Sequence, residues 1–513
     1  MGVCHDCVMT VDGTPLRTCM TPVRDGMMVE VELDAQLPEA APARLRHVVL
    51  EPDVLVVGAG PGGLAAAAVA AEAGADVLLV DERAKPGGQY FKQPSDAFDV
   101  DEQAVDPQYR RGRELVARVE RAGATVLMGV QVWAATGPHE LHALGNGCAY
   151  ALHPRRLVIA TGAYERGVPL PGWTLPGFMT TGAAQTLMRA YQVLPGRRVL
   201  VSGNGPLNIQ VAAELVRAGA TVVALCETAR PASPRRAGAV AAMAASAPDL
   251  MRDGIGYART LRSARVPMLF GHSVVRAVGQ GRVERATVAR LDSSGRPVPG
   301  SDRDFDVDAV CAGFGFLPSN ELARTIGVEH AYDTALGQLV AVRGPDGRTG
   351  IDDVWVVGDS GGTGGARLAQ AVGLLAGSSV ARSLGLRATE PHDAERDRTR
   401  NERFQRALWR LYAGPRLVDQ LAGPDTLVCR CESVPLRAVD EAFSDGIATI
   451  GALKRVTRAG MGRCQGRYCA GVLAELAARR SAGPIDEDAW FAPSLPFKPL
   501  PVGVVADALE PGR

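Results

Sequence analysis

The sequence has no excess of charge of either sign. Its 56 lysine and arginine residues balance 56 aspartate and glutamate residues, so the formal net charge is zero. Proteins that bind nucleic acids or anionic membranes usually carry a basic surplus. The composition therefore gives no support for either function.

Long hydrophobic runs are also missing. The longest apolar stretches, such as GLAAAAVAAEAGA, are rich in glycine and alanine and shorter than the roughly 20 residues that a membrane-spanning helix needs. The first residues do not show the pattern of a secretory signal peptide. We therefore expect a cytoplasmic protein without a transmembrane segment. A length of 513 residues with 46% hydrophobic content predicts two to four domains.

The ten cysteines do not have the spread of a secreted disulfide framework. Seven lie in two clusters with the spacing of metal ligands, and three lie singly in apolar, strand-like surroundings: Cys148, Cys226 and Cys311. This distribution indicates a reducing compartment.

Four cysteines near the C-terminus form the pattern C-x-C, 32 further residues and C-x4-C. They are Cys429, Cys431, Cys464 and Cys469. Thiolates one residue apart cannot form an unstrained disulfide, but both can bind one cluster. The glycine-rich loop around the second pair lets backbone N–H groups approach the sulfurs, and its Arg463 and Arg467 can offset the cluster's negative charge. The spacing predicts a [2Fe-2S] cluster, with a structural zinc site as the alternative.

A strand, a glycine turn, a helix and a second strand are predicted in VLVVGAGPGGLAAAAVAAEAGADVLLVDE. Gly58 makes the turn, Gly60 lets the backbone approach a pyrophosphate, and Gly63 allows close packing of helix on strand. Asp81 ends the second strand, where a carboxylate can accept hydrogen bonds from a ribose, and Glu82 is the alternative. This unit predicts a dinucleotide site.

Two further pieces favour FAD. RLVIATGAYER is an apolar strand ending in a turn, and DVWVVGDSGGTGGARLAQAV is another, followed by a helix whose positive N-terminus can face a flavin. The aspartate of the second piece could instead only cap that helix. In these pieces and in the loop KPGGQYF, the expected FAD contacts are Gly88, Gln89, Thr161, Gly162, Gly358 and Asp359.

A second nucleotide-binding unit is predicted in RRVLVSGNGPLNIQVAAELVRAGATVVALCE. Its turn has Gly203 and Gly205, but Asn208 replaces the third glycine. Glu227 would favour a ribose diol, so we expect NAD or an adenine nucleotide rather than NADP, or an inherited domain with no ligand. No C-x2-C or C-x4-C lies near the flavin strands, which argues against a disulfide-reductase mechanism.

The first 32 residues contain Cys4, Cys7 and Cys19, and they resemble the second half of a plant-type [2Fe-2S] ferredoxin. The first ligand of that pattern would lie two codons before Met1. Either the gene starts further upstream, the hypothesis we favour, or the segment is a remnant without a cluster. VDGTP predicts a hairpin in this segment, and residues 38–46 form a linker.

From about Leu55 to Gly471 the chain resembles the flavin-binding alpha subunits of heteromeric dye-linked amino-acid and opine dehydrogenases. These include octopine and nopaline oxidases, L-proline and hydroxyproline dehydrogenases and hydrogen cyanide synthase. The resemblance is carried by ATGAYERGVPLPGWTLPGFMTTGAAQTL, GYARTLRSARVPMLFGH, VDAVCAGFGFLPSNELAR and the Gly358–Asp359 loop. LVCRCESV and TRAGMGRCQGRYC resemble a bacterioferritin-associated-ferredoxin type [2Fe-2S] domain.

The resemblance implies an α/β fold of the two-dinucleotide-binding flavoprotein type, with a small helical [2Fe-2S] domain and a partial ferredoxin segment. The expected units are a ferredoxin-like segment (1–37), a linker (38–50), an FAD domain in two parts (51–165 and 331–390), a nucleotide domain (166–330), a helical linker (391–424), a [2Fe-2S] domain (425–480) and a tail (481–513). The fusion of the ferredoxin segment is a departure, because relatives often carry it as a small separate subunit.

The resemblance also implies an electron-transferring subunit of an amine, imino-acid or opine dehydrogenase complex. In the complexes that it resembles, the substrate is usually oxidised at a second flavin in an amino-acid-oxidase-like beta subunit. The sequence agrees with that division, because it has no residue set that we recognise as a clamp for an amino-acid carboxylate. The alternatives are a freestanding NADH-dependent reductase that uses its own cluster and a non-catalytic nucleotide carrier.

Overall fold

The computed structural model describes residues 8–18, 21, 23–30, 45–98, 107–231, 236–389, 391–481, 483–500, 503 and 505. Cys4, Cys7 and Cys19 lie outside the described residues. The hairpin predicted at VDGTP is present: β1 (Val8–Val11) pairs antiparallel with β2 (Thr14–Arg17), and β3 (Val29–Glu30) joins them. The turn residues Asp12 and Gly13 both have positive φ, as a tight hairpin turn requires.

The first nucleotide-binding unit is a five-stranded parallel sheet in the order β24-β11-β5-β6-β7. The strands are β5 (Val54–Val57), β6 (Val77–Asp81), β7 (Thr125–Met128), β11 (Arg156–Ile159) and β24 (Val354–Val356). Their near-continuous apolar composition suits strands that are covered on both faces. In this order β5 lies at the centre of the sheet. Its C-terminal turn lies at the edge of the sheet where folds of this type bind their ligands.

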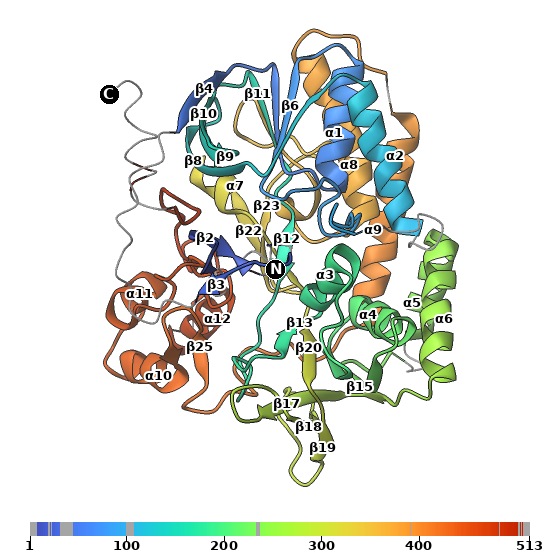
Figure 1. Ribbon diagram of the computed structural model, residues 1–513, viewed down its shortest axis with the longest axis vertical. Helices are drawn as coiled ribbons and strands as arrows, with labels where there is room; N and C mark the ends of the chain where they lie inside the picture. The colour runs from blue at the N-terminus through green and yellow to red at the C-terminus, as the bar shows by residue number, and fades with distance from the viewer. Residues whose placement is uncertain are drawn as a thin grey trace.

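Three helices cover one face of this sheet: α1 (Pro61–Glu72), α2 (Pro107–Arg121) and α8 (Ala366–Ser383) (Figure 1). Small residues let α1 and α8 approach closely, since a Cβ on Gly373 would lie 2.2 Å from the carbonyl oxygen of Gly62. The other face packs on the sheet β4-β10-β9-β8, formed by β4 (Arg46–Leu50), β8 (Gln131–Gly137), β9 (Glu140–Gly145) and β10 (Cys148–Leu152). Parts of the chain that are far apart in sequence thus share one core.

The second unit repeats the plan with the parallel order β13-β20-β14-β15-β16. Its strands are β13 (Phe178–Thr180), β14 (Arg198–Gly203), β15 (Thr221–Glu227), β16 (Met268–Phe270) and β20 (Ala309–Gly313), and its helices are α3 (Thr181–Tyr191), α4 (Pro206–Arg217), α5 (Ala237–Ser246) and α6 (Pro248–Ser263). An antiparallel sheet of β17 (His272–Val278), β18 (Arg285–Arg290) and β19 (Arg303–Asp306) packs beside it. The two units are linked by a ribbon of β12 (Ala163–Glu165) and β21 (Phe316–Pro318).

The remaining elements surround the junction of the two units. They are α7 (Glu321–Thr325), the hairpin β22 (His330–Asp333) and β23 (Gln338–Ala341), the 3-10 turn η3 (Gly358–Gly361) and α9 (His392–Leu411). The C-terminal domain has β25 (Leu427–Cys429), β26 (Val434–Pro435), α10 (Leu436–Ser444), α11 (Ile450–Thr457) and α12 (Ala470–Ser481). The linker helix α9 is not simply exposed, because Phe404, Ala407 and Leu408 are buried against α5. Within the described residues, no helix has the length and apolarity to cross a bilayer.

Candidate functional site

The glycine turn between β5 and α1 has the geometry that the sequence predicts. Gly58 has φ +112°, and a Cβ there would lie 2.3 Å from the carbonyl oxygen of Ala160. A Cβ on Gly63 would lie 1.9 Å from the carbonyl oxygen of Gly58, so only glycine lets α1 sit this close to β5. A Cβ on Gly60 would meet nothing within 4 Å, because this backbone faces open space. The turn can therefore accept a pyrophosphate against Gly60 and the N-terminus of α1.

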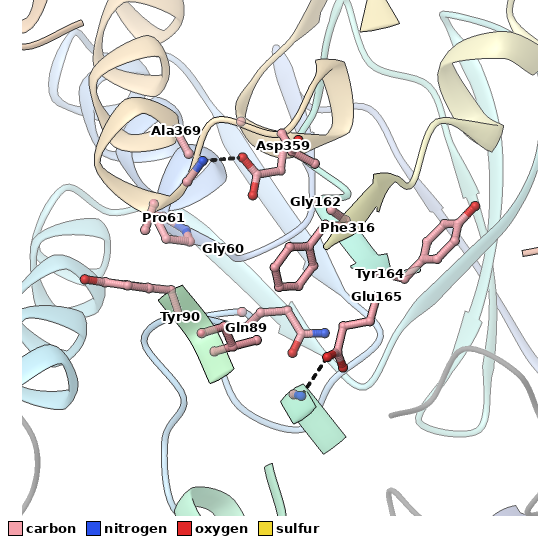
Figure 2. A pocket seen from close by; sticks show the side chains of 18 of the residues that line it. Gly60, Pro61, Gln89, Tyr90, Gly162, Tyr164, Glu165, Phe316, Asp359 and Ala369 are labelled. Atoms are coloured by element: carbon pink, nitrogen blue, oxygen red, sulfur yellow. Dashed lines mark hydrogen bonds between the residues drawn. The ribbon is translucent and has the colours of Figure 1, made fainter. Parts of the chain in front are cut away.

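A cavity of about 680 Å³ begins at this turn and runs to the second nucleotide unit. Its size lies within the range of roughly 300 to 1,000 Å³ for small-molecule and cofactor sites. All three predicted flavin pieces line it, and Figure 2 shows Gly60, Gly162 and Asp359 around one space with Gln89 and Glu165 across from them. The predicted flavin residues in its wall are Gly58, Gly60, Asp81, Glu82, Gly88, Gln89, Thr161, Gly162, Gly358 and Asp359. The open turn and the converging loops fit a dinucleotide.

The two acidic residues at the end of β6, Asp81 and Glu82, make different contacts. Asp81 accepts hydrogen bonds from the backbone N–H groups of Ala59 (2.7 Å) and Arg83 (2.8 Å), so one carboxylate oxygen holds the glycine turn and the other holds the loop that follows β6. Burial raises the pKa of Asp81. Glu82 lines the cavity and pairs with Lys498 at 3.3 Å. These contacts favour Glu82, the alternative from the sequence, as the acceptor for a ribose hydroxyl.

Asp359 both caps a loop and faces the cavity. Its Oδ1 accepts hydrogen bonds from the N–H groups of Gly364 and Gly365, both at 2.9 Å, just before α8 begins. Among the described residues, none donates a hydrogen bond to Oδ2. Burial raises the pKa of Asp359, while the nearby Arg343 guanidinium and the two N–H groups oppose that shift. The capping role and the ligand role, which the sequence left as alternatives, are therefore compatible.

Two other predicted contacts are positioned by their neighbours. Thr161 donates a hydrogen bond from Oγ1 to the carbonyl oxygen of Ser319 at 2.6 Å, which ties the turn after β11 to the second unit. Gly88 packs directly on the first glycine turn, since a Cβ there would lie 2.8 Å from the Cα of Gly60. The loop that includes Gln89 therefore packs against the turn.

In the second unit, Glu227 occupies the place that Asp81 has in the first. Its carboxylate accepts hydrogen bonds from the N–H groups of Gly205 (2.9 Å) and Ala229 (2.8 Å) and from the side-chain amide of Asn204 (2.9 Å). The next residue is Thr228, so the chain has no second carboxylate at the position equivalent to Glu82. We expected Glu227 to bind a ribose, but its carboxylate already accepts hydrogen bonds from its own turn.

Asn208 explains how the second unit tolerates the loss of its third glycine. The side chain is buried, donates from Nδ2 to the carbonyl oxygen of Gly313 at 2.9 Å, and accepts from the Thr181 hydroxyl at 2.8 Å. Gly203 keeps its steric role, because a Cβ there would lie 1.8 Å from the carbonyl oxygen of Gly313. Two hydrogen bonds thus replace the close contact of helix on strand that a glycine would give.

The four C-terminal cysteines come together in the last domain. The Sγ atoms of Cys429 and Cys431 are 3.9 Å apart, and those of Cys431 and Cys464 are 3.7 Å apart. Cys429, Cys464 and Cys469 are buried, while Cys431 is half-buried, and the Gly460 N–H donates to Cys429 Sγ at 3.5 Å. Across the described ranges, no group of three or more His, Cys, Asp or Glu side chains is close enough to hold one metal ion. A [2Fe-2S] cluster distributes its ligands over two irons.

The loop between Cys464 and Cys469 also forms part of the wall of the same cavity. Arg467 and Tyr468 both line the cavity. Arg467 is buried, donates from Nη1 to the carbonyl oxygen of Cys464 at 3.0 Å, and pairs through Nε with Glu321 at 2.9 Å. The prediction that Arg467 offsets cluster charge is therefore incomplete, because Glu321 already neutralises it. Arg463, in contrast, is exposed.

The structure brings into the cavity several residues that sequence reasoning missed. Lys92, Glu165 and Gln185 all line it. Lys92 directly follows the loop KPGGQYF, and Glu165 lies inside the piece RLVIATGAYER, but no local pattern marked either one as a residue of the cavity wall. Gln185 lies on α3 in the middle of an ordinary amphipathic helix. Only the packing of the two nucleotide units brings these side chains together.

Comparisons with known proteins agree with this architecture. The pyridine nucleotide-disulphide oxidoreductase family matches residues 52–373, and the BFD-like [2Fe-2S] binding domain matches residues 427–479. An opine oxidase subunit of Rhizobium meliloti (strain 1021) is 32% identical over 479 residues, which is 90% of this chain and 99% of that protein. The chain therefore belongs to the pyridine nucleotide-disulphide oxidoreductase family. Within it, the chain is an FAD-dependent oxidoreductase of the opine oxidase type with a C-terminal [2Fe-2S] domain, as the resemblance implied.

Other members of this family and a solved structure extend the likeness. Hydrogen cyanide synthase subunit HcnB of Pseudomonas aeruginosa is 32% identical over 457 residues, covering 87% of this chain and 97% of that protein. The crystal structure of L-proline dehydrogenase from P. horikoshii superposes with a TM-score of 0.68 at 21% identity, over 97% of this chain and 87% of that one, and confirms the predicted fold. A 2Fe-2S iron-sulfur cluster binding domain also matches residues 1–32.

Proposed function

We propose that this family member transfers electrons within an amine, imino-acid or opine dehydrogenase complex, from the flavin of a partner protein to an acceptor. FAD supplies the two-electron chemistry and a [2Fe-2S] cluster supplies one-electron transfer when both are bound. The opine oxidase relative and HcnB are each named as one subunit of a larger enzyme, which supports a hetero-oligomer. The partner would be an amino-acid-oxidase-like flavoprotein, and a further candidate is a small ferredoxin-like subunit.

The observation that carries this proposal is the shared wall between the flavin cavity and the cluster domain. Arg467 and Tyr468 lie between two of the proposed cluster ligands and line the cavity at the same time. Buried Tyr164, on β12, lies on the same wall, and burial together with the Glu321 carboxylate raises its pKa. One loop thus belongs both to the proposed cluster site and to the cavity wall. This arrangement suits electron transfer inside one chain.

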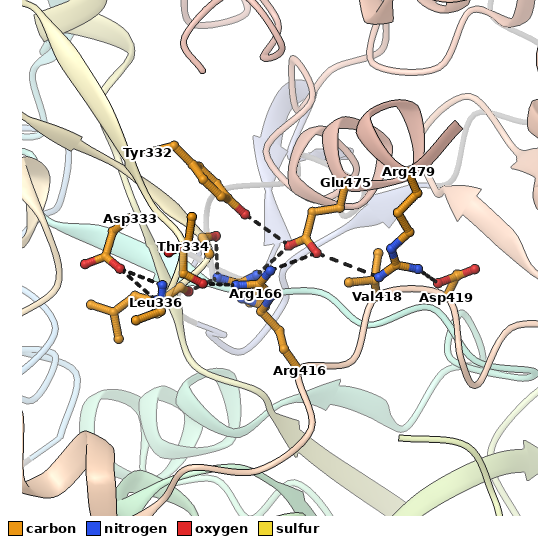
Figure 3. Close-up of polar contacts among 12 residues, drawn as sticks. Arg166, Tyr332, Asp333, Thr334, Leu336, Arg416, Val418, Asp419, Glu475 and Arg479 are labelled. Atoms are coloured by element: carbon orange, nitrogen blue, oxygen red, sulfur yellow. Dashed lines mark hydrogen bonds and ion pairs between the residues drawn. The ribbon is translucent and has the colours of Figure 1, made fainter. Parts of the chain in front are cut away.

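A cluster of charged side chains connects the C-terminal domain to the rest of the chain (Figure 3). Glu475 on α12 lies 3.2 Å from Arg416 and 3.9 Å from Arg166, and Tyr332 donates to it at 3.4 Å. Arg166 also donates to two backbone carbonyls in the β22–β23 turn, each at 2.8 Å. Buried groups with this many partners strongly favour one arrangement. These contacts support a defined position of the C-terminal domain relative to the cavity.

The same contacts suggest residue roles. Cys429, Cys431, Cys464 and Cys469 would ligate the cluster. Glu82 would accept from the adenosine ribose of FAD, and the Oδ2 of Asp359 would accept a hydroxyl of its ribityl chain. The turn at Gly60 and the N-terminus of α1 would hold the pyrophosphate.

The second candidate function is a freestanding NADH-dependent reductase. This function is supported by the intact second nucleotide-binding fold, in which the backbone at Gly205 faces open space, as it does at Gly60. Against it, the Gly205 N–H already donates to Glu227, and the residue after Glu227 is a threonine that cannot act as a second carboxylate for a ribose. NAD or an adenine nucleotide in this site therefore stays a secondary proposal.

An anaerobic comparison of the complex and the single chain separates the two functions. The native complex is purified, and amines, imino acids and opines are screened for dye reduction. With an active substrate, the flavin should bleach and the cluster's paramagnetic signal should appear in the complex. In a complex carrying Cys464→Ser, flavin bleaching should persist while dye reduction falls. Rapid bleaching and turnover of the single chain by NADH, with no amine-dependent activity in the complex, would establish the reductase instead.

A further inference from the structure

Lys92 is a buried amine in the cavity wall with no role in the function proposed above. The residue is only 6% exposed, and it lines the cavity three positions after Gln89. Its Nζ donates one hydrogen bond, to the side-chain oxygen of Gln185 at 3.1 Å. Within the described part of the chain, no carboxylate oxygen lies within 4.0 Å of this Nζ. An ammonium group has three donors, so two of them are available to a ligand.

The charged groups that face Lys92 come from four different elements. They are Arg83 after β6, Glu165 on β12, Arg189 on α3 and Glu214 on α4. Glu165 is already engaged, since it accepts from the Gly182 N–H at 2.8 Å at the start of α3. Glu214 is paired with Arg189 at 2.6 Å. Arg83 in turn lies beside the Asp81 carboxylate, so these neighbours already have partners and the Lys92 ammonium has no ion-pair partner of its own among the described residues.

A buried charge without a partner is unfavourable, and the protein can relieve it by losing the proton or by pairing the charge. Burial lowers the pKa of Lys92 to about 7. The amine is consequently close to half-protonated at neutral pH. An anion that entered the cavity would pair with it and stabilise the protonated form.

We propose that Lys92 anchors the carboxylate of a small organic monoanion that binds in this cavity. One unpaired ammonium group matches a single carboxylate. A phosphate would bring a charge of about −1.5 to −2 and usually requires several donors or an arginine fork. Arg189 cannot supply that fork, because Glu214 and Gln108 already occupy its guanidinium. Arg83, the other arginine near Lys92, lies beside the Asp81 carboxylate. This chain would thus hold its own small-molecule ligand near the flavin, in addition to any substrate site on a partner.

Benzoate is a suitable probe for the FAD-loaded protein, with uncharged benzamide as the matched ligand and the visible flavin spectrum as the readout. Wild-type protein should bind benzoate at pH 6 and bind benzamide at least tenfold more weakly. Lys92→Met should weaken benzoate binding by about tenfold or more, and Lys92→Arg should retain most of it. Lys85→Met is the control, because Lys85 pairs with Asp96 on the exposed surface and does not line the cavity.

The pH dependence of benzoate affinity tests whether the Lys92 ammonium is the group that binds the anion. Benzoate affinity of the wild type should fall by roughly tenfold for each pH unit above about 7, since only the ammonium form pairs with the anion. The affinity of Lys92→Arg should stay constant over the same range. FAD content and melting temperature of each variant verify that it is folded.

Three results would overturn the proposal. The first is benzoate affinity in Lys92→Met equal to that of the wild type. The second is a wild type that binds neither benzoate nor acetate at pH 6, or that binds inorganic phosphate more tightly than benzoate. The third is a changed flavin midpoint potential in Lys92→Met with unchanged benzoate affinity, which would make the flavin itself the partner of Lys92.

Discussion

Replacing Asp359 by asparagine and by alanine separates its two roles. Asparagine keeps a side-chain oxygen that can accept from the N–H groups of Gly364 and Gly365, but it places an amide where the carboxylate oxygen Oδ2 faces the cavity. Alanine removes both groups. We expect Asp359→Asn to fold with nearly the wild-type melting temperature and to lose FAD, and Asp359→Ala to lose FAD and also stability.

The magnitudes follow from the number of hydrogen bonds at stake. A hydrogen bond to a charged group contributes about 1.5 to 3 kcal/mol, and every 1.4 kcal/mol changes an affinity tenfold. One lost bond between FAD and Oδ2 should therefore weaken FAD binding by about 10- to 150-fold in Asp359→Asn. Asp359→Ala additionally leaves two backbone N–H groups unsatisfied at the start of α8, a cost of about 1 to 3 kcal/mol for each one that stays buried.

The assay is the dissociation constant of FAD for apoprotein, measured by flavin fluorescence quenching, together with thermal unfolding of the apoprotein. The apoprotein melting temperature isolates the loop contribution, because no ligand is present. If Asp359→Asn binds FAD as tightly as the wild type, Asp359 acts only as a cap and the flavin site has been assigned incorrectly.

Three further predictions test other parts of the molecule. Cys464→Ser should abolish the paramagnetic signal of the reduced cluster while FAD stays bound; stoichiometric zinc without iron in anaerobically prepared wild type would contradict the cluster. Glu475→Gln should leave Arg166 buried without its carboxylate, weaken docking of the C-terminal domain by about 3 to 5 kcal/mol and speed limited proteolysis near residues 412–427; wild-type proteolysis would show that the ion cluster is dispensable. Burial raises the pKa of Glu227 from 4.5 to about 7, so the folded state retains a proton that the unfolded state releases, and stability should fall as pH rises from about 4.5 to about 7. Glu227→Gln should lack that part of the dependence in melting curves, and an identical pH profile would refute the assignment.

The sequence by itself determined the fold and the flavin turn, because both depend on short-range rules. The apolar strands, the glycine at a positive φ and the glycine under the helix are local requirements, and Gly58 and Gly63 meet them as predicted. The cysteine spacing likewise indicated the [2Fe-2S] domain, since the ligand pattern is written along the chain. The hairpin at Asp12–Gly13 follows from the same kind of rule.

Only the tertiary structure decided what each polar group in the cavity does. Asp81 and Glu82 are neighbours with the same charge, and the sequence could not tell which one holds the turn; the backbone N–H groups of Ala59 and Arg83 assign that task to Asp81. Lys92 had no local pattern to mark it, because its burial arises where α3 packs against the loop after β6. The contact of the cluster loop with the cavity joins residues more than 300 positions apart. Charge burial and contacts between domains depend on which surfaces meet, and the spacing of residues along the chain does not encode them.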